Sequence, residues 1–229
     1  MLFDKTIYIA RRNRLKSQIK SGLILLFGNN DSPANYPANV YPYRQDSSFL
    51  YFFGLHRNGL VGVIDIDNDK EYLVGNDIDI EDIVWFGSVD SVADMAQQCG
   101  VAESKPLSQL RNMVEQAKAC GQTIHFLPPY RHDIMIQIMD LLGIHPSEQR
   151  EKASLELIKA VIDQRAVKGA EEIAEIERAC AIGYEMHTTA MQLCKPGVTE
   201  QYIAGTISGI AAAKGCMVSF PTILSMHGE

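Results

Sequence analysis

The residues that could do chemistry are scattered along the chain and complete no catalytic or metal-binding motif. The stretch Asp65-Ile-Asp67-Asn68-Asp69 resembles the start of a calcium loop, but Lys70 stands where that loop requires glycine. Ser17-Gln-Ile-Lys20 fits the short SxxK pattern, which recurs by chance. The GxGxxG, P-loop, HExxH and GxSxG motifs are all absent from the sequence. These stretches therefore favour a hairpin turn and a helix end over a calcium site and a serine nucleophile.

Two histidines and an acidic run give weaker signals. His187 lies beside the apolar face of a predicted helix, where a buried structural histidine is commoner than a ligand. His227 follows a predicted strand, a position that often carries function, but Glu229 is its only carboxylate neighbour. The acidic run 77–82 suits the first turn of a helix, because the helix dipole favours negative charge there. None of these predicts a catalytic or metal-binding residue in this chain.

Trp85 and the pair Arg44 and Asp46 are the residues that the sequence singles out. Trp85, the only tryptophan, lies between a predicted acidic helix, 79–84, and a glycine, which indicates a loop. Tryptophan is usually largely buried, but in a loop it offers a large rigid apolar plate that suits an interface or a substrate rim. We expect Trp85 to serve such a surface. Arg44 and Asp46 precede a predicted strand, and we expect them to tie an aromatic loop to the sheet as a structural pair.

Composition excludes several classes of protein. The chain has 229 residues, 46% of them apolar and 21% charged, which is typical of a globular fold. Its net charge of −7 argues against binding to nucleic acid or to an anionic membrane. Five cysteines without a CxxC pair argue against a disulfide framework and indicate a reducing compartment. No signal pattern opens the sequence, and the apolar run 23–27 is far shorter than the roughly 20 residues that span a bilayer. We expect a soluble cytoplasmic protein.

Hydrophobic periodicity predicts an α/β region followed by a helical one. Helical spacing covers 6–20, 79–84, 91–98, 106–119 and 132–142, and strands are predicted at 22–28, 49–53, 61–66, 71–74 and 123–127. Residues 29–42 read as an aromatic loop. Alternating strands and helices of this kind predict an α/β sandwich.

The second region consists of a connecting helix, two further helices and one strand. The connecting helix is predicted at 151–162, a long helix at 170–194, a helix capped by Thr199, and a strand at 216–225. We expect domains at 1–150 and 165–229, joined by residues 151–164. Two helices and one strand lack a partner sheet. We therefore expect the second domain to be incomplete, with the chain ending inside it.

Several segments resemble, in order, those of Xaa-Pro aminopeptidases. The most specific is Tyr43-Arg44-Gln45-Asp46-Ser47-Ser48-Phe49-Leu50-Tyr51-Phe52-Phe53-Gly54, which is similar to the family's aromatic-Arg-Gln-Asp-Ser-x-Phe-x-Tyr-x-x-Gly signature. The other segments are 8–15, 22–30, 84–87, 165–173 and 195–200. The resemblance runs essentially from end to end.

The resemblance implies a creatinase-like N-terminal domain, with a mixed sheet flanked by helices, followed by a truncated α+β pita-bread domain. It implies a parent metallo-aminopeptidase that cleaves the residue before proline in peptides. The family's two divalent metals, usually manganese, sit on two Asp, one His and two Glu that all follow the last predicted strand. The resemblance thus implies no catalytic residue, metal ligand or cofactor in this chain, which should be inactive. Its partners would be proline-containing peptides and further copies of itself, without nucleic acid or membrane.

Two other classes of function stay open at this point. The chain could belong to a metal-free, peptidase-like interaction module, as in some chaperones that bind histones, or to an amidinohydrolase resembling creatinase. Two Asp about ten residues apart, followed by His and two Glu, downstream of residue 229 would support the peptidase. The N-terminal signature favours the aminopeptidase.

Overall fold

The computed structural model describes residues 2–228, apart from the side chains of residues 81, 82 and 86. Contacts within the chain divide it into two compact units, Met1–Val167 and Lys168–Glu229, and each is described by itself. The first unit holds the predicted α/β region together with the helix that was expected to connect the two domains.

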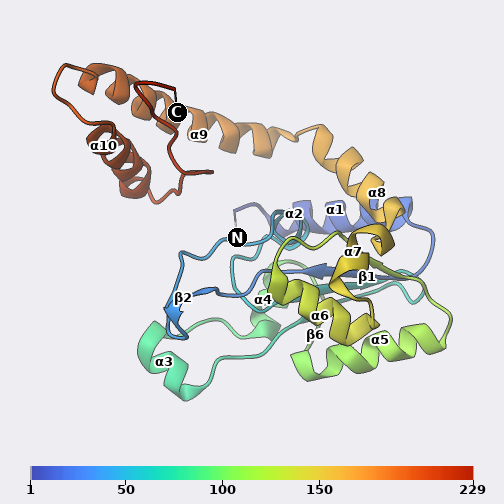
Figure 1. Cartoon of the computed structure of the whole chain (residues 1–229). Helices are drawn as coiled ribbons and strands as arrows, with labels where there is room; N and C mark the ends of the chain where they lie inside the picture. The colour runs from blue at the N-terminus through green and yellow to red at the C-terminus, as the bar shows by residue number, and fades with distance from the viewer. Residues whose placement is uncertain (1, 229) are drawn as a thin grey trace. The chain divides into compact units, whose positions relative to one another are not determined.

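A five-stranded mixed sheet forms the centre of the first unit (Figure 1). Its order is β6-β5-β4-β1-β7. Its strands are β1 (Leu23–Phe27), β4 (Val61–Asp65), β5 (Lys70–Val74), β6 (Glu103–Lys105) and β7 (Ile124–Phe126). β1 pairs antiparallel with β4 and parallel with β7, while β5 pairs antiparallel with β4 and parallel with β6. The expected mixed sheet flanked by helices is confirmed.

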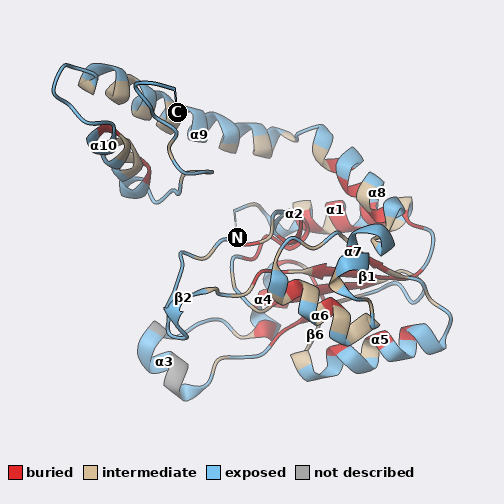
Figure 2. Ribbon diagram, viewed as in Figure 1, coloured by how far each residue is buried: buried red, intermediate tan, exposed pale blue. Residues whose placement is uncertain are grey.

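Helices cover both faces of this sheet because β1 is apolar on both of its sides. Ile24 and Leu26 pack in one core with α1 (Lys5–Gln18), α2 (Ser47–Phe53), α4 (Val92–Gln98) and α8 (Leu155–Ala166). Leu23 and Leu25 pack on the opposite face with α5 (Leu110–Ala119). Alternate residues of a strand point to opposite faces, so five apolar residues in a row make a strand that is buried on both faces. The buried residues accordingly concentrate on the sheet and on the helix sides that face it (Figure 2).

The remaining elements of the first unit are short or lie at its surface. They are the hairpin strands β2 (Pro33–Tyr36) and β3 (Asn39–Val40), α3 (Ile80–Phe86), the 3-10 helix η1 (Leu107–Gln109), α6 (His132–Leu142) and α7 (Pro146–Lys152). The β2–β3 hairpin lies within the segment predicted to be a loop, and β6 was not predicted. Residues 151–162 were predicted to form one helix, but Ala153 ends α7 and Ser154 caps α8.

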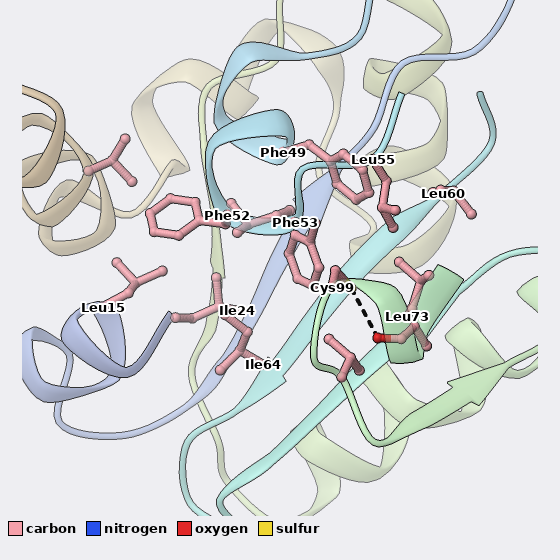
Figure 3. Close-up of a cluster of buried hydrophobic side chains, with 14 of the residues drawn as sticks. Leu15, Ile24, Phe49, Phe52, Phe53, Leu55, Leu60, Ile64, Leu73 and Cys99 are labelled. Carbon is pink, nitrogen blue, oxygen red and sulfur yellow. Dashed lines mark hydrogen bonds between the residues drawn. The ribbon is translucent and has the colours of Figure 1, made fainter. Parts of the chain in front are cut away.

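Residues 49–53 form the helix α2 and not the predicted strand. The Asp46 carboxylate accepts hydrogen bonds from the backbone N–H groups of Ser48 and Phe49, at 2.9 and 2.8 Å, and this cap starts the helix. Phe49, Phe52 and Phe53 then fall on the buried side at helical spacing (Figure 3). Aromatic residues favour strands on average, but here the cap and the helical spacing of the three rings decide the conformation. Gly54 ends the helix at φ 68°, where a Cβ would collide with the Tyr8 ring.

Cys99 lies inside the core shown in Figure 3, where its thiol donates to the backbone oxygen of Ala96 at 3.3 Å. Burial raises the pKa of this thiol to about 11. The other four cysteines, at 120, 180, 194 and 216, are exposed.

We expect a thiol reagent at pH 8 to modify four cysteines of the native chain rapidly and the fifth only after unfolding. The thiolate is the reactive form, and at pH 8 Cys99 is both protonated and covered. Mass spectrometry of the partly labelled protein identifies the slow site. Rapid native labelling of Cys99 would contradict the described core.

The second unit pairs α9 (Ala170–Leu193) with α10 (Glu200–Ala213). Thr199 caps α10 as predicted, because its hydroxyl accepts from the Tyr202 N–H at 3.3 Å. The strand predicted at 216–225 is wrong: no strand forms among residues 168–228. A strand needs hydrogen-bonding partners along its length, and the described part of this unit supplies none. No helix within residues 2–228 has the length and apolarity needed to cross a membrane.

We expect the amides of α9 and α10 to exchange with solvent faster than those of β1 and β4. α9 contains no buried residue, and α10 contains only Ile203 and Ala211. Helices gain most of their stability by packing an apolar face, so these two should open at low cost. Hydrogen exchange with mass spectrometry measures the difference. Equal protection of both units in a chain shown to be monomeric would contradict it, whereas self-association through these helices would slow exchange.

Candidate functional site

The loops that leave β1 and β7 meet because the two strands are parallel and neighbouring. Asn29 follows β1, and its side-chain amide donates to the hydroxyl of Tyr130, which follows β7, at 3.1 Å. The same amide donates to the backbone oxygen of Arg44 at 2.8 Å. The Tyr130 hydroxyl donates in turn to the Asp46 carboxylate at 3.2 Å. The signature motif of residues 43–54 is thus held to the carboxyl edge of the sheet.

Gln45 is the most fully engaged side chain of this edge. It is 4% exposed, and its amide oxygen accepts from the N–H groups of Asn29 and Asp46 at 2.8 and 2.9 Å. Its amide nitrogen donates to the backbone oxygens of Leu55 and Arg57 at 3.2 and 2.8 Å. All four bonds that the amide group can form are therefore made inside the protein.

The structure assigns separate roles to the two residues predicted as a pair. Asp46 caps α2 and accepts from Tyr130. Arg44 is exposed, and its backbone oxygen, through Asn29, joins the loop to β1. Gln45, which lies between the two, also ties the loop to the end of β1, because its side chain accepts from the Asn29 N–H. Sequence reasoning missed it, although its place inside the signature was a signal.

Two tyrosines at this edge act as hydroxyl donors. The Tyr43 hydroxyl shares its one proton between the backbone oxygens of Asn29 and Arg57, at 3.2 and 3.0 Å. Burial raises the pKa of the Tyr43 phenol, and burial likewise raises that of Tyr130. Both groups therefore stay protonated and keep donating at neutral pH.

An ion pair between Arg131 and Asp133 lies beside this network, in the segment that follows β7. Burial acts to raise the pKa of Asp133, but hydrogen bonds from Asn30 and Arg131 outweigh it, and the pKa is lowered. Arg131 donates to Asp133 at 3.1 Å and to the backbone oxygen of Asn30 at 2.9 Å. The carboxylate is therefore ionised and paired.

The spaces beside this network are small. A cavity of about 40 Å³ lies against Asn29, Asp46 and Tyr130, and a more open hollow of about 250 Å³ lies beside Asn30 and Asp133. The first has room for little more than water.

Trp85 lies on a different part of the first unit, in the last turn of the short helix α3. Its side chain is 83% exposed, and those of Ile80 and Val84 are 81% and 78% exposed. The loop expected around Trp85 is thus a helical turn, followed by Gly87 at φ 77°. We call the side chains of Ile80, Val84 and Trp85 the Trp85 surface. Exposed apolar groups that cluster in this way are typical of contact sites.

The structure also places the acidic stretch 65–69 and the two histidines, His187 and His227, that the sequence had pointed to. Residues 65–69 form the β4–β5 turn, in which Asn68 binds the Asp65 carboxylate, as expected. The expectation of a buried His187 is wrong, since it is exposed on α9 beside a cavity of about 480 Å³. His227 is also exposed.

The metal pair that the resemblance implies does not fit the donors described here. Among the side chains that the structure describes, which exclude those of residues 81, 82 and 86, no three His, Cys, Asp or Glu are grouped so that they could hold an ion.

This mixed α/β fold, with its signature motif at the carboxyl edge, matches a known family. The family "Aminopeptidase P, N-terminal domain" matches residues 8–125, and the chain belongs to it. Among curated relatives, the Xaa-Pro aminopeptidase of Escherichia coli K12 is 27% identical over 205 residues, which cover 86% of this chain and 46% of the relative. A probable Xaa-Pro aminopeptidase of Paracoccidioides brasiliensis is 24% identical over 219 residues, 93% of this chain and 41% of its own length.

Solved structures show the same fold. Zinc-substituted E. coli aminopeptidase P in complex with product superposes with a TM-score of 0.76 at 24% identity, over 93% of this chain and 50% of that one. Pseudomonas aeruginosa aminopeptidase PepP gives 0.75 at 22% identity, with the same coverage. The chain spans about half the length of the relatives that it matches.

Proposed function

We propose that this chain is the N-terminal part of a cytoplasmic Xaa-Pro aminopeptidase, a hydrolase that removes the residue before proline from the start of a peptide. The observation that carries the proposal is the family match over residues 8–125, which includes the whole signature motif at 43–54. The names of the curated relatives support the reaction.

The chemistry of this reaction belongs, in the proposal, to residues outside this chain. Two divalent metals, manganese in the native enzyme, would supply an activated water and polarise the peptide carbonyl. The zinc-substituted relative supports a metal-dependent reaction. This chain would contribute a rigid N-terminal domain, and by itself it would be inactive.

The reaction is tested with the longer protein that this proposal requires and two peptides that differ only in residue two, proline or alanine. We expect hydrolysis of the proline peptide, much slower hydrolysis of the alanine peptide, loss of activity on chelation and recovery with manganese. Equal cleavage of both peptides, or metal-independent cleavage, would reject the proposed reaction.

We propose further that the Trp85 surface forms a substrate rim or an interface between copies of the enzyme. Because Trp85 is 83% exposed, Trp85→Ala should change the free energy of unfolding by less than about 0.5 kcal/mol. It should raise the Michaelis constant several-fold or weaken association. If Trp85 were part of the core, Trp85→Ala would instead lower the free energy of unfolding by about 3–5 kcal/mol. Unchanged kinetics and assembly would reject the surface role.

A further inference from the structure

Residues 76–91 connect β5 to α4 within the first unit, and the Trp85 surface lies in the middle of this segment. The two ends of the segment are held together. The Asp77 carboxylate accepts from the Val92 N–H at 2.6 Å, and the Asn76 side-chain oxygen accepts from the Leu107 N–H at 3.0 Å. The segment is therefore a loop with a fixed neck and an exposed tip.

Arg57 closes this neck from outside the segment. One nitrogen of its guanidinium donates to the backbone oxygen of Asn76 at 2.6 Å, and the other donates to that of Asp90 at 3.3 Å. The planar fork of a guanidinium suits two acceptors at a fixed separation. A single side chain thus bridges the residues where the loop leaves and rejoins the domain.

The signature motif in turn holds Arg57. The backbone oxygen of Arg57 accepts from the Gln45 side chain at 2.8 Å and from the Tyr43 hydroxyl at 3.0 Å. Gln45 is 4% exposed and is itself bound to β1 through the Asn29 N–H. A series of hydrogen bonds therefore runs from Asn29, just after β1, through the signature motif and Arg57 to the neck of the loop.

We propose that Arg57 is a positioning residue that holds the Trp85 surface in place for its contact. The proposal rests on the proposed role of Trp85, and it assigns a purpose to the Tyr43 and Gln45 part of the signature motif. Without the guanidinium, the neck keeps the Asp77 and Asn76 bonds, so the domain stays folded while the loop tip moves over a wider range.

The single tryptophan allows this motion to be measured in the chain itself. Loop motions occur on the nanosecond scale that time-resolved fluorescence anisotropy reports. The fast, nanosecond phase of the Trp85 anisotropy decay reports local motion of the loop. Its amplitude should be about twice as large in Arg57→Met as in the wild type.

The matched control is Arg111→Met, because Arg111 also donates to a backbone oxygen, that of Asp140 at 2.7 Å, which lies outside residues 76–91. It should leave the anisotropy decay of Trp85 unchanged. An unchanged decay in Arg57→Met, or the same change in both variants, would overturn the proposal.

Kinetics of the longer enzyme separate this proposal from the role of Trp85. Arg57→Met should raise the same constant that Trp85→Ala raises, either the Michaelis constant or the dissociation constant between copies, with less effect on kcat. The double variant should be no worse than Trp85→Ala alone, because both changes act through one contact. Additive effects would overturn positioning through Trp85. If Trp85→Ala has no effect, the surface role fails, while the anisotropy still decides whether Arg57 holds the loop.

Discussion

Replacing Arg12 by methionine is expected to lower the free energy of unfolding of the first unit by about 3–5 kcal/mol. Arg12 is fully buried on α1. Its guanidinium binds the Glu71 carboxylate at 2.7 Å and donates to the backbone oxygens of Phe52, Cys99 and Gly100 at 2.9 to 3.2 Å. Methionine fills a similar space but leaves a largely buried carboxylate and three carbonyls without this donor. Urea denaturation followed by circular dichroism measures the loss.

Arg14→Met is the matched control, because Arg14 is exposed on the same helix. It should change stability by no more than about 0.5 kcal/mol. If Arg12→Met fails to fold, Arg12→Lys replaces it in the test. Lysine keeps the positive charge but lacks the planar set of donors of the guanidinium, so this variant should fold with reduced stability. Equal stabilities for the variants at positions 12 and 14 would show that the buried guanidinium contributes little.

Gln45→Glu is expected to destabilise the first unit by about 3 kcal/mol or more at pH 7. The substitution hardly changes the shape of the side chain, and the oxygen that accepts from Asn29 and Asp46 is kept. The nitrogen that donates to Leu55 and Arg57 becomes an oxygen facing two carbonyl oxygens. An ionised carboxylate is therefore repelled there, and it is also buried.

The pH dependence of this variant follows from the same contacts. Repulsion and burial raise the folded-state pKa of the introduced carboxyl above its unfolded value of about 4.3. The added penalty is therefore smallest below about pH 4.3, where the group is protonated in both states and can donate one bond, and it grows as pH rises through the raised pKa.

Thermal unfolding of wild type and Gln45→Glu between pH 4 and pH 8 tests this dependence, with exposed Gln116→Glu as the control. A stability difference that does not change with pH would contradict the burial of this side chain against the backbone oxygens of Leu55 and Arg57.

Local patterns in the sequence predict most of the first unit. Residues 23–27 form a strand, as expected for a short apolar run between glycines, and residues 61–65 pair with 70–74 across the predicted turn. The strand predicted at residues 49–53 is wrong. Aromatic side chains favour strands on average, but the Asp46 carboxylate binds a backbone N–H three residues later and starts a helix.

The candidate site was harder to predict because its bonds join residues distant in sequence. Asp46 meets Tyr130 across 84 positions, and Arg57 meets Asp90 across 33. Hydrophobic periodicity does not identify hydrogen-bond partners that are distant in sequence. The roles of Gln45 and Arg57 were therefore not predicted. Trp85 is exposed although apolar residues such as Ile80 and Val84 precede it in the same helix, and its role at a surface stays a prediction. Its partner remains a proposal.

We propose that residues 1–229 belong to a metallo-aminopeptidase whose metal ligands lie outside these residues. Calorimetric titration with manganese, of this chain and of the longer protein, tests it most directly. We predict two manganese ions per copy of the longer protein and no stoichiometric micromolar binding to residues 1–229. A stoichiometric micromolar manganese site in this chain, or none in the longer protein, would contradict the claim.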